Sequence, residues 1–129
     1  MKKLIAILVF VFGVSTAHAS ETDLIGTYAA MKNGQLTEVI KVTKEDGKFF
    51  IADKLGNGTW RKAKQLLSSF SREQFEKILK HKVDYPFDGL ASNRVAVIKV
   101  PKGFQEGKFK SESGFLMFAS IGLVELHKL

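Results

Sequence analysis

The chain has 129 residues, of which 45% are hydrophobic and 26% are charged, with two prolines and no cysteine. This is the composition of one ordinary globular domain, and it excludes a disordered chain, a collagen and a small fold held by disulfides. The formal net charge of +7 at first sight favours a nucleic-acid-binding protein. Part of that charge, however, lies in an N-terminal segment that we do not expect to belong to the folded domain.

The first 19 residues have the pattern of a secretory signal peptide. Lys2 and Lys3 form a positively charged start, residues 4–14 are apolar, and residues 17–19 (Ala-His-Ala) form a small-residue cleavage site. The alternative is a transmembrane anchor, but 11 apolar residues are fewer than the roughly 20 that cross a bilayer. We therefore expect cleavage after Ala19, a bacterial periplasmic or secreted product, and one β-rich domain over residues 20–129.

Removal of this segment changes the charge balance. The remaining 110 residues carry 18 Lys and Arg against 13 Asp and Glu, a net charge of +5. A domain of this length buries enough surface for one core without disulfides. Because the domain is only moderately basic and is expected to leave the cytoplasm, we do not expect nucleic acid as its partner.

The first half of the domain has the pattern of an antiparallel meander. Turn signals recur every eight to twelve residues between β-branched and aromatic runs. Asn33-Gly34 is the strongest of them, because both residue types tolerate a positive φ in a two-residue hairpin. The pattern predicts four strands, over residues 24–30, 35–43, 48–53 and 59–64.

A helix is predicted next, because the hydrophobic period changes. Residues 71–74 (Ser-Arg-Glu-Gln) fit a capping box, and the helix should run to about His81. Phe75, Ile78 and Leu79 form one apolar stripe that can pack on a sheet. The helix exterior offers i, i+4 charge pairs such as Arg72 with Glu76.

The second half is predicted to return to strands. After an irregular segment over residues 82–93, strands are expected at 94–100, 108–112, 115–120 and 123–128. Residues 115–119 are apolar at every position, so that strand either lies centrally under the helix or separates a core from a ligand cavity. The predicted fold is mainly β with one helix (α+β), in the order ββββ-α-ββββ: an antiparallel meander forming a small barrel or strongly curved sheet with the helix packed on it.

Two short segments carry a family resemblance. Gly26-Thr27-Tyr28 and Gly58-Thr59-Trp60 resemble the Gly-x-Trp signature near the start of lipocalin-like barrels. The resemblance covers these few residues and implies a small barrel or strongly curved sheet. It assigns no functional residue.

The residue inventory argues against catalysis. The domain has two histidines, His81 and His127, without metal-ligand spacing, and it has no nucleophile or phosphate-binding motif. Asp84 and Asp88, which flank Tyr85 and Phe87, are the best pair for general acid and base chemistry. The alternative is that both aspartates start turns around Pro86 and Gly89. We therefore expect no enzyme, no metal and no cofactor, and keep a small hydrolase using Asp84 and Asp88 in reserve.

Binding is better supported, through aromatic and charged side chains in two regions. Such side chains dominate protein interfaces, although lysines on strand edges also simply keep a small β protein soluble. The candidate binding residues are Trp60, Arg61, Lys62, Asp84, Tyr85, Phe87, Asp88 and Phe104.

The leading functional hypothesis is an exported, non-enzymatic binding protein, most of all a protein-binding inhibitor or immunity-type module. Its partner would be another exported or periplasmic protein, such as a toxin or a wall-degrading enzyme, or an anionic component of the cell envelope. The alternative is a lipocalin-like carrier of an apolar ligand or lipid. The sequence leaves the partner, the binding face and the oligomeric state open.

Overall fold

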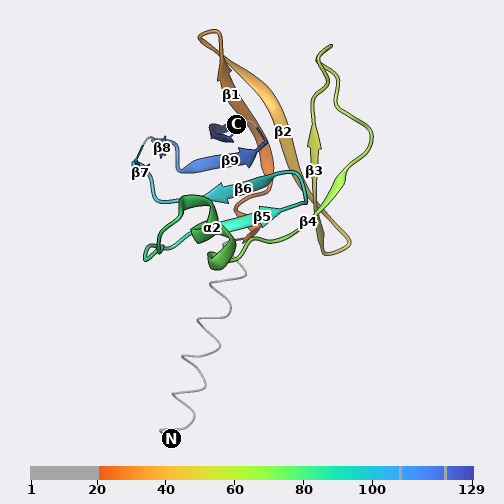
Figure 1. Cartoon of the computed structure of the whole chain (residues 1–129). Coiled ribbons are helices and arrows are strands. Elements are labelled where there is room, and N and C mark those ends of the chain that lie inside the picture. Colours follow the sequence, from red (N-terminus) through yellow and green to blue (C-terminus); the bar gives the residue numbers. More distant parts are fainter. Residues whose placement is uncertain (1–20, 108, 121) are drawn as a thin grey trace, which may run out of the picture.

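The strands follow the turn signals of the sequence in a computed structural model that describes residues 21–107, 109–120 and 122–129 (Figure 1). The predicted signal peptide lies outside the described residues. Gly26 to Lys128 contain ten strands and the helix α2 in the order β1(Gly26–Lys32), β2(Gln35–Glu45), β3(Lys48–Asp53), β4(Gln65–Ser69), α2(Arg72–Leu79), β5(Asp88–Ala91), β6(Ala96–Lys99), β7(Phe104–Glu106), β8(Phe109–Ser111), β9(Phe115–Ala119) and β10(Gly122–Lys128).

Eight of these strands close into an antiparallel barrel in the order β1-β10-β9-β6-β5-β4-β3-β2. Apart from the step from β6 to β9 and the closing pair of β1 with β10, neighbours in the barrel are neighbours in the chain, as expected for a meander. β1 and β10 close the ring through the pairs Tyr28–Lys128 and Ala29–His127. The predicted β-rich barrel with one helix is therefore confirmed, and the hairpin of β7 and β8 lies outside it.

The fourth strand is not where the sequence pattern places it. Residues 59–64 were predicted to form it, but β4 is Gln65–Ser69. Asn57 turns the chain locally, because its side-chain oxygen accepts hydrogen bonds from the backbone N–H and the hydroxyl of Thr59. Trp60 then makes an isolated bridge to Lys54, so this segment packs as a long loop.

Two further predictions in the second half are wrong in detail. The segment 82–93 was predicted to be irregular but contains the four-residue strand β5, which pairs with β4 through Ser68–Ala91 and Ser69–Leu90 and with β6 along its whole length. Residues 108–112 were predicted to be a strand of the main sheet. Instead, Phe109–Ser111 pairs with Phe104–Glu106 in the separate hairpin.

The hairpin and helix signals are confirmed. Asn33 and Gly34 have φ values of 50° and 79° in the β1–β2 turn. Ser71 caps α2: its hydroxyl accepts from the Gln74 backbone N–H, and the Gln74 side chain accepts from the Ser71 N–H. The helix ends slightly earlier than predicted, because Lys80 adopts a left-handed conformation with φ 65°.

The barrel interior is filled by side chains. Strand alternation points one residue in two inward, and the inward residues form a cluster that is at most 4% exposed. Its members are Leu24, Tyr28, Ile40, Val42, Ile51, Leu67, Leu90, Val97 and Leu126. Val39, Val95 and Met117 pack against this cluster and are partly exposed.

A second core, which we call the outer core, lies outside the barrel, between β6, β9 and the segments that cover them. One of these segments is α2 (Figure 1). Ile98 and Leu116 face this core, whereas Val97 and Met117 face the interior. The helix contributes Phe75, which is fully buried, together with Ile78 and Leu79. The predicted apolar stripe is thus confirmed. Of the two alternatives for the apolar strand, the structure shows a position between the interior cluster and the second core.

One end of the barrel is closed by residues 21–25. Leu24 is 0% exposed within the interior cluster, and its carbonyl accepts a 2.6 Å hydrogen bond from the Tyr28 hydroxyl. Lys99 pairs with the Asp23 carboxylate at 3.1 Å, and Lys128 donates to the Asp23 carbonyl at 2.6 Å. We call this the plugged end.

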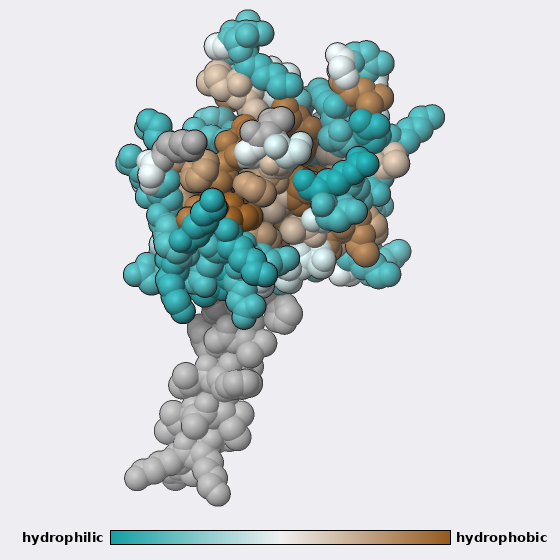
Figure 2. All heavy atoms as spheres, viewed as in Figure 1, coloured by the Kyte–Doolittle hydropathy of each residue, from teal (hydrophilic) through white to brown (hydrophobic). Residues whose placement is uncertain are grey.

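The outer surface combines hydrophilic and apolar areas. Figure 2 shows apolar side chains gathered in the middle of one face, with hydrophilic side chains around them. Among the described residues, no helix is long and apolar enough to cross a membrane.

Candidate functional site

The aromatic candidates of the second half lie together in the outer core. The rings of Tyr85, Phe87 and Phe104 have centroids 6.4, 4.9 and 6.4 Å from that of Phe75. Tyr85 and Phe104 also contact each other edge-on at 5.7 Å. Their first role is therefore packing between α2 and the barrel, and their role in binding stays a prediction.

The two aspartates of this region differ in burial. Asp84 is exposed, whereas Asp88 begins β5 and is partly buried. In the register of β5 and β6, Asp88 lies opposite Lys99, so the sheet fixes the position of its backbone. The hydrolase hypothesis, which needs both carboxylates in one cleft, stays untested.

The Trp60 candidates pack on another side of the barrel. The ammonium groups of Lys41 and Lys54 lie 4.7 and 5.2 Å from the centroid of the indole ring, close enough for cation–π attraction. Arg61 pairs with Asp53 at 3.1 Å. These contacts fix the β3–β4 loop against β2 and β3.

The structure does not unite the two groups of sequence candidates. Trp60 contacts lysines of β2 and of the end of β3, and Lys62 beside it is exposed. The aromatic group of the second half covers β6 and β9, which are three or four places away from β2 and β3 in a ring of eight strands. One small ligand cannot contact both groups.

A groove that the sequence did not indicate lies at the plugged end. It has a volume of about 840 Å³ and runs between residues 21–22, the β2–β3 turn and β4. Its floor consists of Phe49, Leu67 and Leu90, which belong to the interior cluster or pack against it. Leu67 and Leu90 are only 4% and 1% exposed, so Phe49, which is partly buried, and Leu66, which is 56% exposed, supply most of the apolar surface that a ligand can reach.

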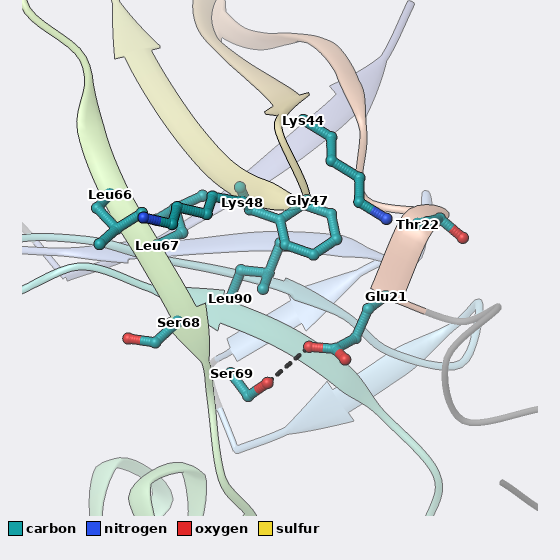
Figure 3. Close-up of a pocket in the computed structure, with 11 residues that line it drawn as sticks. Glu21, Thr22, Lys44, Gly47, Lys48, Leu66, Leu67, Ser68, Ser69 and Leu90 are labelled. Atoms are coloured by element: carbon teal, nitrogen blue, oxygen red, sulfur yellow. Dashed lines mark hydrogen bonds between the residues drawn. The ribbon is translucent and has the colours of Figure 1, made fainter.

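Polar and charged side chains form the walls of the groove (Figure 3). On one side, Glu21 accepts a 2.7 Å hydrogen bond from the Ser69 hydroxyl, which ties the N-terminal segment to β4. Lys44 extends across toward Thr22, and Lys48 lies along Leu66 (Figure 3). The site thus combines an apolar floor with a cationic rim.

The two lysines of the rim, Lys44 and Lys48, differ from nearby lysines in their salt bridges. Lys64 pairs with Glu45 at 2.9 Å, and Lys99 pairs with Asp23 at 3.1 Å. Neither Lys44 nor Lys48 makes a salt bridge within the described part of the chain, although the Lys44 ammonium lies 5.3 Å from the Phe49 ring centroid. Both side chains are exposed.

Sequence reasoning missed this groove for a physical reason. Its walls come from segments more than 40 positions apart, and placing β4 at residues 59–64 put Leu67 and Ser69 outside any strand. The one local signal was the pair of lysines flanking the tight turn at Asp46-Gly47. Only the closed barrel shows that this turn faces the N-terminal segment.

Among the described residues, no group of three or more His, Cys, Asp or Glu side chains is placed to bind a metal ion, at the groove or elsewhere.

Comparisons of the chain with protein-family models, with curated proteins and with solved structures found no match. The function is therefore best argued from the chemistry of the groove.

Proposed function

We propose that this protein is a non-enzymatic binding protein that holds a small, partly apolar ligand in the groove at the plugged end. The observation that carries this proposal is the groove of about 840 Å³ over Phe49, Leu67 and Leu90. Small-molecule sites are clefts of roughly 300–1,000 Å³ with apolar linings and a few polar groups that orient the ligand. The volume of the groove lies in this range, and four of its eleven lining residues are apolar.

This proposal develops the carrier hypothesis and changes the place of the ligand. A carrier with its ligand deep in the barrel has less support, because the interior cluster is at most 4% exposed and occupies that space. Export from the cell remains part of the proposal, on the strength of the signal-peptide pattern of residues 1–19. The protein-binding module and its partners stay predictions.

The test uses the neutral fluorescent probe N-phenyl-1-naphthylamine with the purified protein. We expect saturable fluorescence enhancement, and we expect Leu66→Glu to weaken probe binding at least about tenfold, which corresponds to about 1.4 kcal/mol. Leu66 lines the groove and is 56% exposed, so its replacement places a charge beside the ligand without opening the core.

Leu36→Glu is the matched control. Leu36 is 50% exposed and lies on the β1–β2 hairpin, outside the groove lining. This variant should bind the probe like the original protein. Absence of saturable binding, or equal weakening by both substitutions, would contradict the proposed site.

A further inference from the structure

We infer that the ligand of the groove is a single-chain amphiphile with a carboxylate head group, which Lys44 and Lys48 attract while the alkyl chain covers Phe49 and Leu66. The inference rests on the proposed function, because it assigns the ligand class of the same groove. It combines three observations: the charge of the rim, the composition of the floor and the position of one carboxylate.

The charge of the rim favours an anion. Lys44 and Lys48 are exposed, line the groove and have no carboxylate partner among the salt bridges of the described residues. Beside an apolar surface, a charged pair is less screened than in bulk water. The two ammonium groups lie on different sides of the groove, Lys44 toward Thr22 and Lys48 along Leu66 (Figure 3). An anionic head group beside either of them would gain this attraction without first breaking a salt bridge.

The floor favours one alkyl chain. Leu67 and Leu90 lie at its base but are only 4% and 1% exposed. The apolar surface for a chain comes from Phe49, which is partly buried, and from Leu66, which is 56% exposed. A volume of about 840 Å³ lies in the range of sites for single small molecules. Burial of a chain on this floor would contribute about 0.8 kcal/mol for each methylene removed from water.

Glu21 decides between two kinds of anionic head group. Its carboxylate lies in the opposite wall, held by the Ser69 hydroxyl at 2.7 Å. A phosphate monoester carries a charge of about −1.5 to −2 at neutral pH and would be repelled more strongly than a carboxylate with one charge. The wall therefore favours a monoanion.

The experiment compares five amphiphiles of equal chain length by displacement of the neutral probe, below their micelle concentrations. These are dodecanoate, dodecyl phosphate, dodecanol, dodecyltrimethylammonium and, as a test of chain number, a short two-chain phosphatidylglycerol with dodecanoyl chains. Dodecanoate should bind at least about tenfold more tightly than each of the others, a difference of about 1.4 kcal/mol.

The variant Lys44→Gln/Lys48→Gln should lose about tenfold in dodecanoate affinity and keep its dodecanol affinity. Lys32→Gln/Lys77→Gln is the control with the same change in net charge; both lysines are exposed and lie outside the groove lining. Its dodecanoate affinity should be unchanged. Added salt should weaken dodecanoate binding to the original protein, because exposed charges are screened.

Failure of the inference and failure of the proposed function give different results. Equal affinity for all head groups, tighter binding of the phosphate, the cation or the two-chain lipid, or an unchanged dodecanoate affinity in the groove variant would overturn the carboxylate assignment and leave the groove as a ligand site. Absence of binding by every amphiphile and by the probe would overturn both.

Discussion

His81 links two elements through both of its ring nitrogens. Nδ1 lies 2.8 Å from the carbonyl oxygen of Lys82, and Nε2 lies 2.6 Å from a carboxylate oxygen of Glu106. Both partners are acceptors, so both contacts are hydrogen bonds only when the ring carries two protons. The hydrogen bond to the Lys82 carbonyl, followed by the interaction with Glu106, accordingly raises the pKa of His81, and desolvation opposes them.

This link makes stability depend on pH. Because the folded state holds the proton more tightly, the stabilisation is fully present below the ordinary imidazole pKa of about 6.5 and is lost as the pH rises through the raised folded value. Thermal unfolding should therefore show a larger Tm difference between the original protein and His81→Gln at about pH 5.5 than at about pH 9. Glu106→Gln should behave alike. A difference of equal size at both pH values would contradict this origin.

Single residues also show which side-chain contacts local sequence rules predict and which they do not. The capping hydrogen bonds of Ser71 and Gln74 were predictable, because both partners lie within one turn. Arg72 and Glu76 were expected to pair with each other, but their hydrogen bonds go to other residues. Arg72 instead donates to the carbonyls of Val83 and Tyr85, and Glu76 accepts from the Val83 N–H, because the segment after α2 folds back along the helix.

At the scale of elements, the stability of α2 comes from its packing in the outer core more than from the helix itself. Eight residues form a marginal helix in isolation. Phe75 is 0% exposed and contacts four other aromatic rings in this core. Docking of this ring on the barrel side is thus the main source of helix stability.

Phe75→Ala should lower the free energy of unfolding by about 3–5 kcal/mol, because it removes a buried aromatic ring and leaves a cavity. Urea denaturation measures this change. Lys77→Ala, on the exposed face of the same helix, is the control and should change stability by less than about 0.5 kcal/mol. Comparable losses in both variants would contradict docking of the Phe75 ring as the main source of helix stability.

Elements were predictable where one local signal decides them. The Asn33-Gly34 hairpin and the apolar stripe of α2 follow from backbone freedom and spacing alone. β4 and β5 do not, because they pair through only two residue pairs and contain Ser68, Ser69 and Gly89. Gly89 is needed there, since a Cβ would lie 2.8 Å from Cβ of Phe70, a contact that no local pattern reveals.

At the scale of the whole molecule, the groove exists because the barrel closes and its end is plugged. Closure joins the first and last strands through Tyr28–Lys128, Ala29–His127 and the hydrogen bond from the Leu129 N–H to the Thr27 carbonyl. Residues 21–25 then cover one end and supply one wall of the groove. The β-rich meander with one helix was predictable from turn spacing, although β4 and β5 were not. The site was not predictable, because it needs the closed ring.

The plug should therefore stabilise the entire barrel. Leu24 is 0% exposed among interior side chains from seven strands, so Leu24→Ala should lower the free energy of unfolding by about 2–5 kcal/mol. Trp60 reports on the β3–β4 loop and far-ultraviolet circular dichroism on all strands, and in a two-state barrel both urea curves should shift by the same amount. Leu36→Ala, at a position that is 50% exposed, should leave both midpoints within about 0.5 kcal/mol of the original. Separate midpoints for the two probes would show instead that residues 21–25 stabilise only their own end, so that the groove could open without unfolding of the barrel.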